Sequence, residues 1–293
     1  MRFPSFNIAA MAGFANSSIS SLFDGSSYLQ NATAGVAGPI FNFGKNKTTV
    51  ISLPGDLKSL NAPGGADAYG FATVVHELGN EWGQLRGTAI KRDAQGNAVI
   101  NSNGTYAVNP GQYLGSVLPD FTGGMNFTLG YKGFDLSAYL YTSIGNEIFN
   151  QSRWFTDFFD TFEGAAISDR LLNAWTPENP NATIPIVSRE SNFSTSNQAN
   201  SYYVEDGSYL RLKNVSLSYN VPFKYLNYTK VIKGVRATIG AQNLFTLTKY
   251  KGYDPEVGAY VGTGASGGNQ AIGIDFGRYP LTRMYTATIS VDF

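Results

Sequence analysis

The stretch MYTATISVDF, residues 284–293, alternates strictly between apolar and polar side chains. Its apolar positions are Tyr285, Ala287, Ile289, Val291 and Phe293. Successive side chains of a strand point to opposite faces, so this stretch is predicted to be a strand with one apolar and one polar face. A soluble β-sandwich packs such a face on its core, whereas a membrane barrel turns it toward lipid. The stretch alone leaves both folds open.

The composition favours an aromatic, weakly charged protein. The chain of 293 residues is 14% aromatic and 14% charged, with 21 basic and 21 acidic side chains and 33 glycines. A typical globular domain is about 25% charged. Since the net charge is zero and no basic block exceeds a few residues, nucleic acid is excluded as a partner, and there is no electrostatic case for an anionic membrane surface.

The chain contains no cysteine, which excludes a disulfide framework and any thiolate metal site. No window approaches the run of about 18 apolar residues that a membrane helix needs. The segment FNIAAMAGFA (6–15) is not predicted to be a signal peptide, because Asn7 interrupts it and only Arg2 precedes it as a cation. If the protein contacts a membrane, we expect it to do so with strands.

No motif predicts an enzyme. The segment VVHELGN (74–80) resembles the start of a zinc-protease helix, but Asn80 stands where the second histidine belongs and His76 is the single histidine of the chain. His76 is therefore predicted to be a loop or rim residue. The segment RDAQGN (92–97) lacks the carboxylates of a calcium loop and is predicted to be a polar turn. We expect no catalytic residue, no metal site and no cofactor.

Five predicted strands define the organisation of the second half. A hairpin with a short turn at Lys132 and Gly133 is predicted within residues 123–145, and further strands within residues 208–221, 234–247 and 284–293. The apolar phase changes between Leu212 and Val215, which indicates either a bulge near Lys213 and Asn214 or a strand that leaves the apolar band there. A weaker strand is predicted at residues 47–53.

The connections between these strands run short, long, moderate and long along the chain. Transmembrane barrels have short periplasmic turns and long outer loops, so this order favours a barrel over a sandwich. It also predicts that the chain ends on the periplasmic side.

Three ordered stretches identify a family resemblance: YYVEDGSYLRLKNVSLSYNVP (202–222), GAQNLFTLTKYKGYDPEV (240–257) and DFGRYPLTRMYTATISVDF (275–293). Together they resemble the C-terminal end of SusC/RagA-type TonB-dependent outer-membrane transporters of Bacteroidetes. Upstream, LRGTAIKRDAQGNAVIN (85–101), YLGSVLPDFTGGMNFTLGYKGFDLS (113–137) and WTPENPNATIP (175–185) also look like the family's pattern. The resemblance covers roughly residues 45–293.

The resemblance implies an all-β fold, an antiparallel transmembrane barrel in the bacterial outer membrane. Residues 45–293 are expected to be the C-terminal portion of this barrel with long extracellular loops, and residues 1–44 a strand and a loop of it. A plugged barrel of this kind has about 22 strands, far more than are predicted here, so we expect roughly its last third, without the plug. The implied partners are a SusD-like surface lipoprotein, the TonB complex through a segment missing here, the barrel-assembly machinery and outer-membrane lipid.

The implied function is import of a nutrient, an oligosaccharide rather than a peptide. Aromatic loop residues that could contact the substrate or the lid lipoprotein are Trp154, Phe155, Phe158, Phe159 and Trp175. Packing of the loop against its neighbours would explain these aromatics equally well.

Strand parity and the chain end supply two further sets of residues. Four polar side chains are expected to face the lumen: Arg211, Lys213, Arg236 and Gln242. Hydrogen bonding to the plug would also explain them. The expected barrel-insertion signal is Tyr285, Ile289, Val291 and Phe293, with the first three facing lipid. Two alternatives stay open at this point: a small passive outer-membrane barrel, and a soluble carbohydrate-binding β-sandwich.

Overall fold

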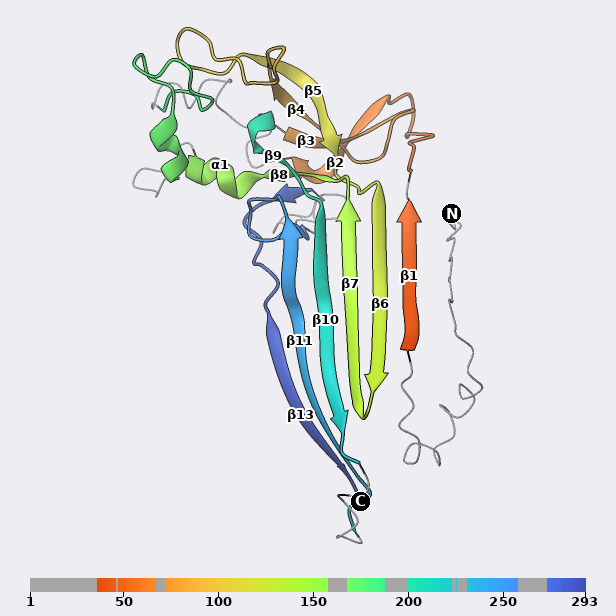
Figure 1. Cartoon of the computed structure of the whole chain (residues 1–293). Coiled ribbons are helices and arrows are strands. Elements are labelled where there is room, and N and C mark those ends of the chain that lie inside the picture. Colours follow the sequence, from red (N-terminus) through yellow and green to blue (C-terminus); the bar gives the residue numbers. More distant parts are fainter. Residues whose placement is uncertain are drawn as a thin grey trace.

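The structure is a computed structural model that describes residues 36–45, 47–66, 72–157, 168–187, 200–222, 225, 231–257 and 273–293. The described residues form three β-sheets (Figure 1). Long strands make one sheet, and shorter strands with a few helical turns make an assembly at one end of it. None of the described helices is long and apolar enough to cross a membrane.

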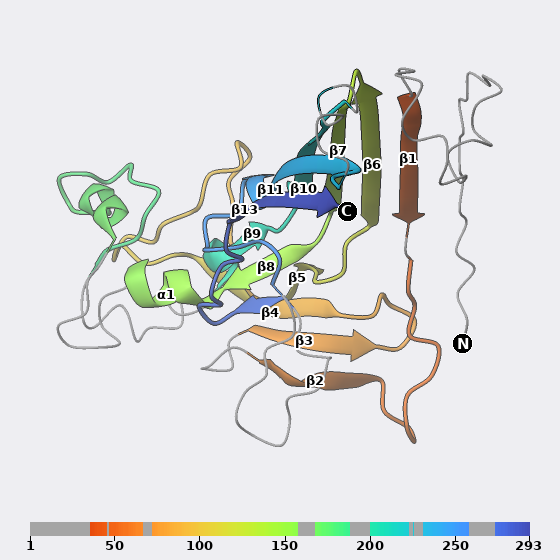
Figure 2. The same ribbon diagram turned by 90° about the horizontal axis from the view of Figure 1, so that it is seen from below.

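The long sheet has six strands, and every neighbouring pair is antiparallel. Its order in space is β1 (Val36–Lys45), β6 (Phe121–Tyr131), β7 (Phe134–Ile144), β10 (Tyr209–Asn220), β11 (Gly234–Thr248) and β13 (Met284–Asp292). The strand direction changes progressively from β1 to β13 (Figure 2), as expected for a twisted sheet. The prediction of antiparallel strands is confirmed.

The predicted hairpin is present as β6 and β7. Its two turn residues, Lys132 and Gly133, both have positive φ values, 47° and 86°. Two such residues make the turn whose twist matches that of the flanking strands. Glycine adopts this conformation without steric cost, and the short loop fixes the register from Tyr131 opposite Phe134 onward.

The predicted bulge is also present. Lys213 has no partner in the ladder, because Leu212 pairs with Leu140 of β7 while Asn214 pairs with Tyr139. The extra residue shifts the side-chain alternation by one position, so Leu212 and Val215 lie on the same face of the sheet. A second irregularity lies opposite in β11, where Asn243 has a φ of 50°.

The weak strand predicted at residues 47–53 is wrong. These residues have no strand assignment, and the strand in this region is β1, which ends at Lys45. The physical reason is that the backbone hydrogen bonds of Val50 are made to a turn and not to a neighbouring strand. The Val50 amide donates to the Asn80 carbonyl, and the Val50 carbonyl accepts from the Gly79 amide. Residues near Val50 are thereby held against the short-stranded assembly.

One face of the six-stranded sheet is apolar and exposed. Its exposed members include Tyr131, Phe134, Leu217, Ile239, Phe245, Leu247, Tyr285, Ile289 and Val291. Aromatic side chains lie at both of its ends: the Phe43 and Phe121 rings are 5.7 Å apart near one end, and the Phe134 and Tyr219 rings are 4.5 Å apart near the other. The opposite face carries polar side chains.

The remaining elements form what we call the loop assembly. It contains a four-stranded sheet of β2 (Ser59–Ala66), β3 (Ala72–Glu77), β4 (Gln84–Ile90) and β5 (Val108–Ser116). It also contains β8 (Glu147–Asn150), α1 (Gln151–Asp157), two 3-10 turns (Asp169–Asn173 and Ser201–Tyr203), β9 (Val204–Asp206) and β12 (Ile274–Asp275).

The long connections all leave the six-stranded sheet at one end. The segments between β1 and β6, between β7 and β10, and between β11 and β13 enter the loop assembly, whereas the β6–β7 turn and the chain end lie at the far end (Figure 1). The most buried apolar side chains also lie in the loop assembly, in a cluster that includes Val74, Leu85, Phe149, Trp154 and Tyr203. We call the six-stranded sheet the wall. The buried apolar core of the described residues lies in the loop assembly, at one end of this sheet.

Candidate functional site: the polar sheet face and the loop assembly

A shallow trough crosses the polar face of the six-stranded sheet at mid-height. The polar side chains that line it are Asn126, Thr128, Ser137, Tyr139, Asn214, Ser216, Gln242 and Thr286. All of them are uncharged, and together they offer both hydrogen-bond donors and acceptors. Gly240 leaves space in the trough, because a Cβ atom there would lie 2.8 Å from the Thr286 hydroxyl.

A cluster of four charged residues closes the polar face next to the loop assembly. Arg211 of β10 donates to Asp254 at 2.6 Å and to Glu256 at 2.8 Å, and Lys213 donates to Glu256 at 2.6 Å. Arg211 is only 2% exposed. Both cations donate to the Glu256 carboxylate. The bulge at Lys213 puts Asn214 on the same face as Arg211, although the two residues are an odd number of positions apart.

These ion pairs bind the segment after β11 to the polar face. Asp254 also accepts hydrogen bonds from the Glu256 and Leu281 amides, at 2.9 and 3.0 Å. Burial alone would raise the pKa of Asp254, but these amides and the Arg211 guanidinium outweigh it and lower the pKa below its ordinary value. Asp254 is therefore a fixed anion that joins three segments of the chain.

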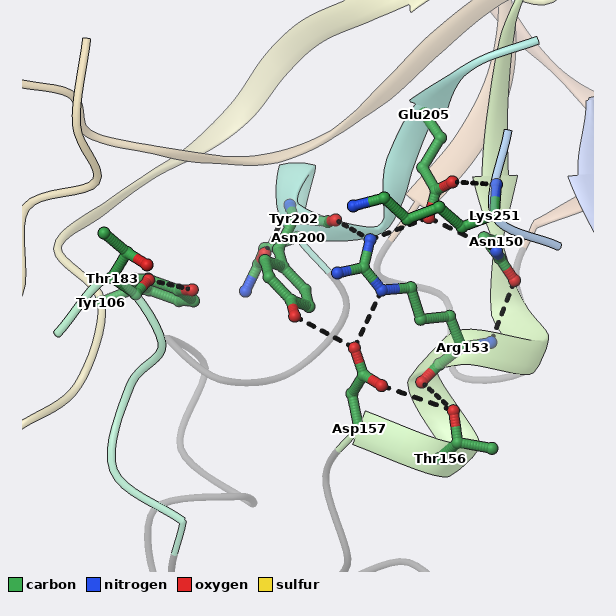
Figure 3. A network of polar contacts seen from close by, with 10 residues as sticks. All are labelled: Tyr106, Asn150, Arg153, Thr156, Asp157, Thr183, Asn200, Tyr202, Glu205 and Lys251. Carbon is green, nitrogen blue, oxygen red and sulfur yellow. Dashed lines mark hydrogen bonds and ion pairs between the residues drawn. The ribbon is translucent and has the colours of Figure 1, made fainter. Parts of the chain in front are cut away.

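A second buried network lies inside the loop assembly (Figure 3). Arg153 of α1 donates to Asp157 and to Glu205, each at 2.8 Å. Its guanidinium lies 4.1 Å from the centre of the Tyr202 ring, and the Tyr202 hydroxyl donates to Asp157 at 3.0 Å. Glu205 also accepts from the Lys251 amide at 2.7 Å. This network connects α1, β9 and the segment after β11.

The second network holds its charges firmly. Burial by itself would lower the pKa of Arg153, but Tyr202, Glu205 and Asp157 raise it above its ordinary value. A buried charge of this kind is retained only where its partners satisfy it. We infer that the two networks together hold the long loops in one arrangement at the end of the six-stranded sheet.

The predicted aromatic contact residues have different positions. Trp154 is 6% exposed and belongs to the core cluster, so its side chain packs inside the loop assembly. Trp175 is half-buried and lies over Gly104, where a Cβ atom would be 2.6 Å from the indole ring. The Phe155 side chain, Phe158 and Phe159 lie outside the described residues. Substrate or lid contact stays a prediction for this set.

The four residues predicted to face the lumen share the polar face of the sheet. Arg211 and Lys213 belong to the charged cluster, and Gln242 lines the trough. Arg236 lies at the other end of the face, 3.5 Å from Asp135. The structure thus places charged pairs at the two ends of the face and uncharged side chains between them.

The residues predicted as an insertion signal lie together on the apolar face. Tyr285, Ile289 and Val291 pair with Ala241, Ala237 and Val235 of β11, and all three are exposed. Phe293 follows the end of β13 and is also exposed. Their roles as lipid contacts and as an insertion signal stay predictions.

The prediction for His76 is wrong. His76 is not a loop or rim residue but lies in β3, 5% exposed, with its ring stacked 4.5 Å from the Trp82 ring. Its Nδ1 accepts a hydrogen bond from the Gly83 amide at 3.2 Å. The alternation of Ala72, Val74 and His76 toward the core explains the burial.

The polar turn at residues 92–97 is confirmed. Asp93 accepts from the Gln95 and Asn97 amides, and Arg92 pairs with Ala98 in a tight hairpin. Within the described part of the chain, no three His, Asp or Glu side chains are grouped as a metal site would require.

Sequence reasoning missed the distant carboxylates of both networks. Asp254 and Glu256 lie about forty residues after Arg211, and Glu205 lies about fifty after Arg153. No local pattern marks such pairs. The only sequence feature that could have drawn attention to these residues is the low charged content of the chain, which makes each charged side chain a candidate for a specific contact.

A search against models of known protein families gives no match. Among curated proteins, the chain is similar to TonB-dependent receptor P3 of Formosa agariphila, with 33% identity over 276 residues, or 86% of this chain and 26% of that relative. It is also similar to TonB-dependent receptor SusC of Bacteroides thetaiotaomicron, with 28% identity over 204 residues, or 69% of this chain and 17% of that relative. The chain spans about a quarter or less of these relatives' length.

Among solved structures, the chain is similar to the RagAB peptide importer in its closed-closed state. The TM-score is 0.67 and the identity 26%, and the match covers 90% of this chain and 28% of that chain. A structure of the RagAB peptide transporter gives a TM-score of 0.66 at 24% identity, which supports the fold. These relatives are receptors and transporters, in agreement with the prediction that the chain is not an enzyme.

Proposed function

Because this chain belongs to the SusC/RagA type of TonB-dependent receptors, we propose that it forms part of an outer-membrane nutrient importer. In this proposal residues 45–293 contribute the C-terminal wall of the barrel and the outer loops above it. Import requires binding and displacement of a plug, with no covalent step. The activity belongs to a longer receptor, of which this chain is one portion.

The apolar face of the six-stranded sheet is the observation that carries the proposal. Between its aromatic ends, β6 runs 11 residues from Phe121 to Tyr131, a length of about 34 Å. At a tilt of about 40° such a strand rises about 26 Å, the height of the apolar band of an outer-membrane barrel. Ile239 and Ile289 on this face are exposed in the described structure. A soluble sandwich would bury them.

The grouping of the loops supports an orientation. Outer-membrane barrels carry their long loops outside the cell and their short turns in the periplasm. We therefore place the loop assembly outside the cell and Phe293 on the periplasmic side, where it would be read by the barrel-assembly machinery. The loop assembly would meet a SusD-like surface lipoprotein, and a segment outside this chain would meet the TonB complex.

We propose an oligosaccharide as the nutrient. The trough on the polar face presents uncharged hydroxyl, amide and phenol groups, which match the hydroxyl groups of a neutral sugar. Trp175, half-buried in the loop assembly, offers an aromatic face on which a sugar ring can stack. A peptide is the second candidate, because the similar RagAB structure is a peptide importer.

The test is uptake by the source organism. A strain that lacks the complete receptor is grown with an oligosaccharide mixture or a peptide mixture as its limiting nutrient, and is compared with the same strain carrying the receptor gene. We expect a growth defect on oligosaccharides that the gene restores. The defect should be reproduced when TonB is removed instead.

The growth results separate an error in the substrate class from an error in the proposed importer. A defect confined to peptides would replace the substrate class and leave the importer in place. No defect on either nutrient, together with absence of the protein from the outer-membrane fraction, would overturn the importer itself.

A further inference from the structure

The polar side chains of the trough form two rows that cross the wall. Residues directly opposite each other in an antiparallel ladder share a face, so the strand register defines both rows. The first row carries three amides and a phenol: Asn126, Tyr139, Asn214 and Gln242. The second row lies two residues further along each strand and carries hydroxyl groups: Thr128, Ser137, Ser216 and Thr286, with Gly240 between the last two.

The trough differs from the rest of the polar face because its polar groups are not bonded to one another. On the side of the β6–β7 turn, the Ser218 and Thr238 hydroxyls lie 2.9 Å apart, and Asn220 donates to Asp135 at 3.0 Å. On the side of the loop assembly lies the charged cluster. Within the described part of the chain, no side chain of the two rows makes a hydrogen bond. Their donors and acceptors are therefore available to a bound molecule.

Tyr139 supplies an aromatic surface in the middle of the first row. Its ring leans over Gly124 of β6, where a Cβ atom would lie 3.0 Å from the phenol oxygen and 3.1 Å from Cε2. Because glycine has no side chain, the ring can lie close to the backbone of the sheet. The register partners of Tyr139 on its two sides are Asn126 and Asn214, and both are exposed. An amide thus flanks the ring on either side, one strand spacing of about 4.8 Å away.

This arrangement matches the chemistry of a sugar ring. A pyranose has an apolar face of C–H groups and a rim of hydroxyls, so an aromatic ring can pack on the face while amides bond the rim. An amide both donates and accepts, as a hydroxyl does. None of the residues that line the trough is charged, so an ionic ligand would find no opposite charge there. The trough has a volume of about 520 Å³, within the range of about 300–1,000 Å³ that is usual for small-molecule sites.

We propose that Tyr139 is the stacking platform of a neutral-sugar subsite on the wall, where Asn126 and Asn214 bind the hydroxyls on its two sides. The inference rests on the proposed function, because it needs the polar face to border the lumen and an oligosaccharide to pass along it. It goes further by assigning the contacts of one sugar unit to named side chains. The subsite would hold that unit while the plug is displaced.

The test measures uptake by cells of the source organism that lack the native receptor and carry the complete receptor as parent or variant. The probes are four tritiated neutral sugars: maltohexaose, cellohexaose, laminarihexaose and mannohexaose. Tyr139→Leu removes the ring, and Tyr139→Phe retains it. Uptake is normalised to the amount of folded receptor in the outer membrane.

A second pair of variants tests the amides. Asn126→Ala with Asn214→Ala removes both proposed hydroxyl contacts. Ser218→Ala with Thr238→Ala is the matched control, because it removes two polar groups of the same face that lie against each other. If Tyr139→Leu leaves no folded receptor, the comparison of these two double variants decides.

We expect at least one of the four sugars to enter cells that carry the parent receptor. For that sugar, kcat/KM of uptake should fall about fivefold or more in Tyr139→Leu and in the double asparagine variant. Tyr139→Phe and the double hydroxyl variant should stay within about twofold of the parent, because the ring and both amides are retained.

Equal uptake by the two Tyr139 variants, together with equal uptake by the two double variants, would overturn the inference. A plug that packs on the trough is the competing explanation. It would be favoured, and the inference overturned, if Tyr139→Leu leaves sugar uptake unchanged but sensitises the cells to vancomycin, which an intact outer membrane excludes. Both results leave uptake by the parent intact. Entry of none of the four sugars with the parent receptor would instead be a failure of the proposed oligosaccharide import, and the subsite would fall with it.

Discussion

At the scale of single residues, the buried ion pairs of this protein join segments of the long loops to each other and to the six-stranded sheet. Arg211 is held by two carboxylates from a distant part of the chain, and Arg153 is held by Asp157 of its own helix and by the distant Glu205. A buried ion pair does not by itself indicate stability, because desolvation offsets much of the attraction. It does specify one arrangement, since any other placement of the loops would leave a buried guanidinium without its partners.

His76 gives a prediction of pH dependence at this scale. Burial lowers the pKa of His76 below its ordinary value of about 6.5. Its Nδ1 can accept from the Gly83 amide only while the imidazole is neutral. As the pH falls below about 6.5, the unfolded state takes up a proton that the folded state resists, so the stability of the loop assembly should decrease.

Hydrogen exchange at the Gly83 amide measures this effect in the complete receptor. After correction for intrinsic rates, exchange should accelerate between pH 7 and pH 5 as the acceptor is lost. The variant His76→Gln keeps an acceptor that does not titrate and serves as the control. Identical pH profiles for the parent and this variant would contradict the assignment.

At the scale of elements, each long strand separates two environments. Ile289 and Thr288 are neighbours on β13, but the first belongs to the apolar face and the second to the polar face. A lysine on the lipid side near the middle of the band costs about 2–4 kcal/mol, whereas a lysine in a polar lumen costs little.

We therefore predict that Ile289→Lys impairs assembly of the complete receptor and that Thr288→Lys does not. The measurement is the fraction of receptor that migrates as a folded, heat-modifiable barrel from the outer-membrane fraction. Since both variants add the same charge to the same strand, the difference between them reports only the face. An equal loss in both would place the apolar face away from lipid.

The bulge between Leu212 and Asn214 could be inferred from the sequence, but the irregularity opposite it in β11 could not. The change of apolar phase predicted it, because a shift of one residue moves every later side chain to the other face. The matching irregularity at Asn243 had no such signal, since apolar side chains of β11 flank it on both parities.

At the scale of the whole molecule, the described six-stranded sheet has two outer strands with an open edge. Among the described residues, β1 and β13 end the six-stranded sheet and lack a partner on their outer sides. The sheet also exposes its apolar face. Unpaired edges and exposed apolar surface both promote association.

The isolated 293-residue polypeptide should therefore aggregate in water unless detergent or the missing strands are supplied. Size-exclusion chromatography with and without detergent measures this directly, and the complete receptor in the same detergent is the control. A monodisperse, detergent-free monomer that unfolds cooperatively would contradict a barrel wall.

The sequence by itself predicted five of the six strands of the wall, their two faces and the hairpin turn, and it offered the bulge as one of two explanations, because each depends on the alternation of neighbouring side chains along one strand. The family resemblance also followed from contiguous motifs. Only the tertiary structure decided what lies above the wall. It buried His76 and Trp154, and it joined the long loops through the ion pairs of Arg153 and Arg211. These placements depend on contacts between residues far apart in the chain, which no local period encodes.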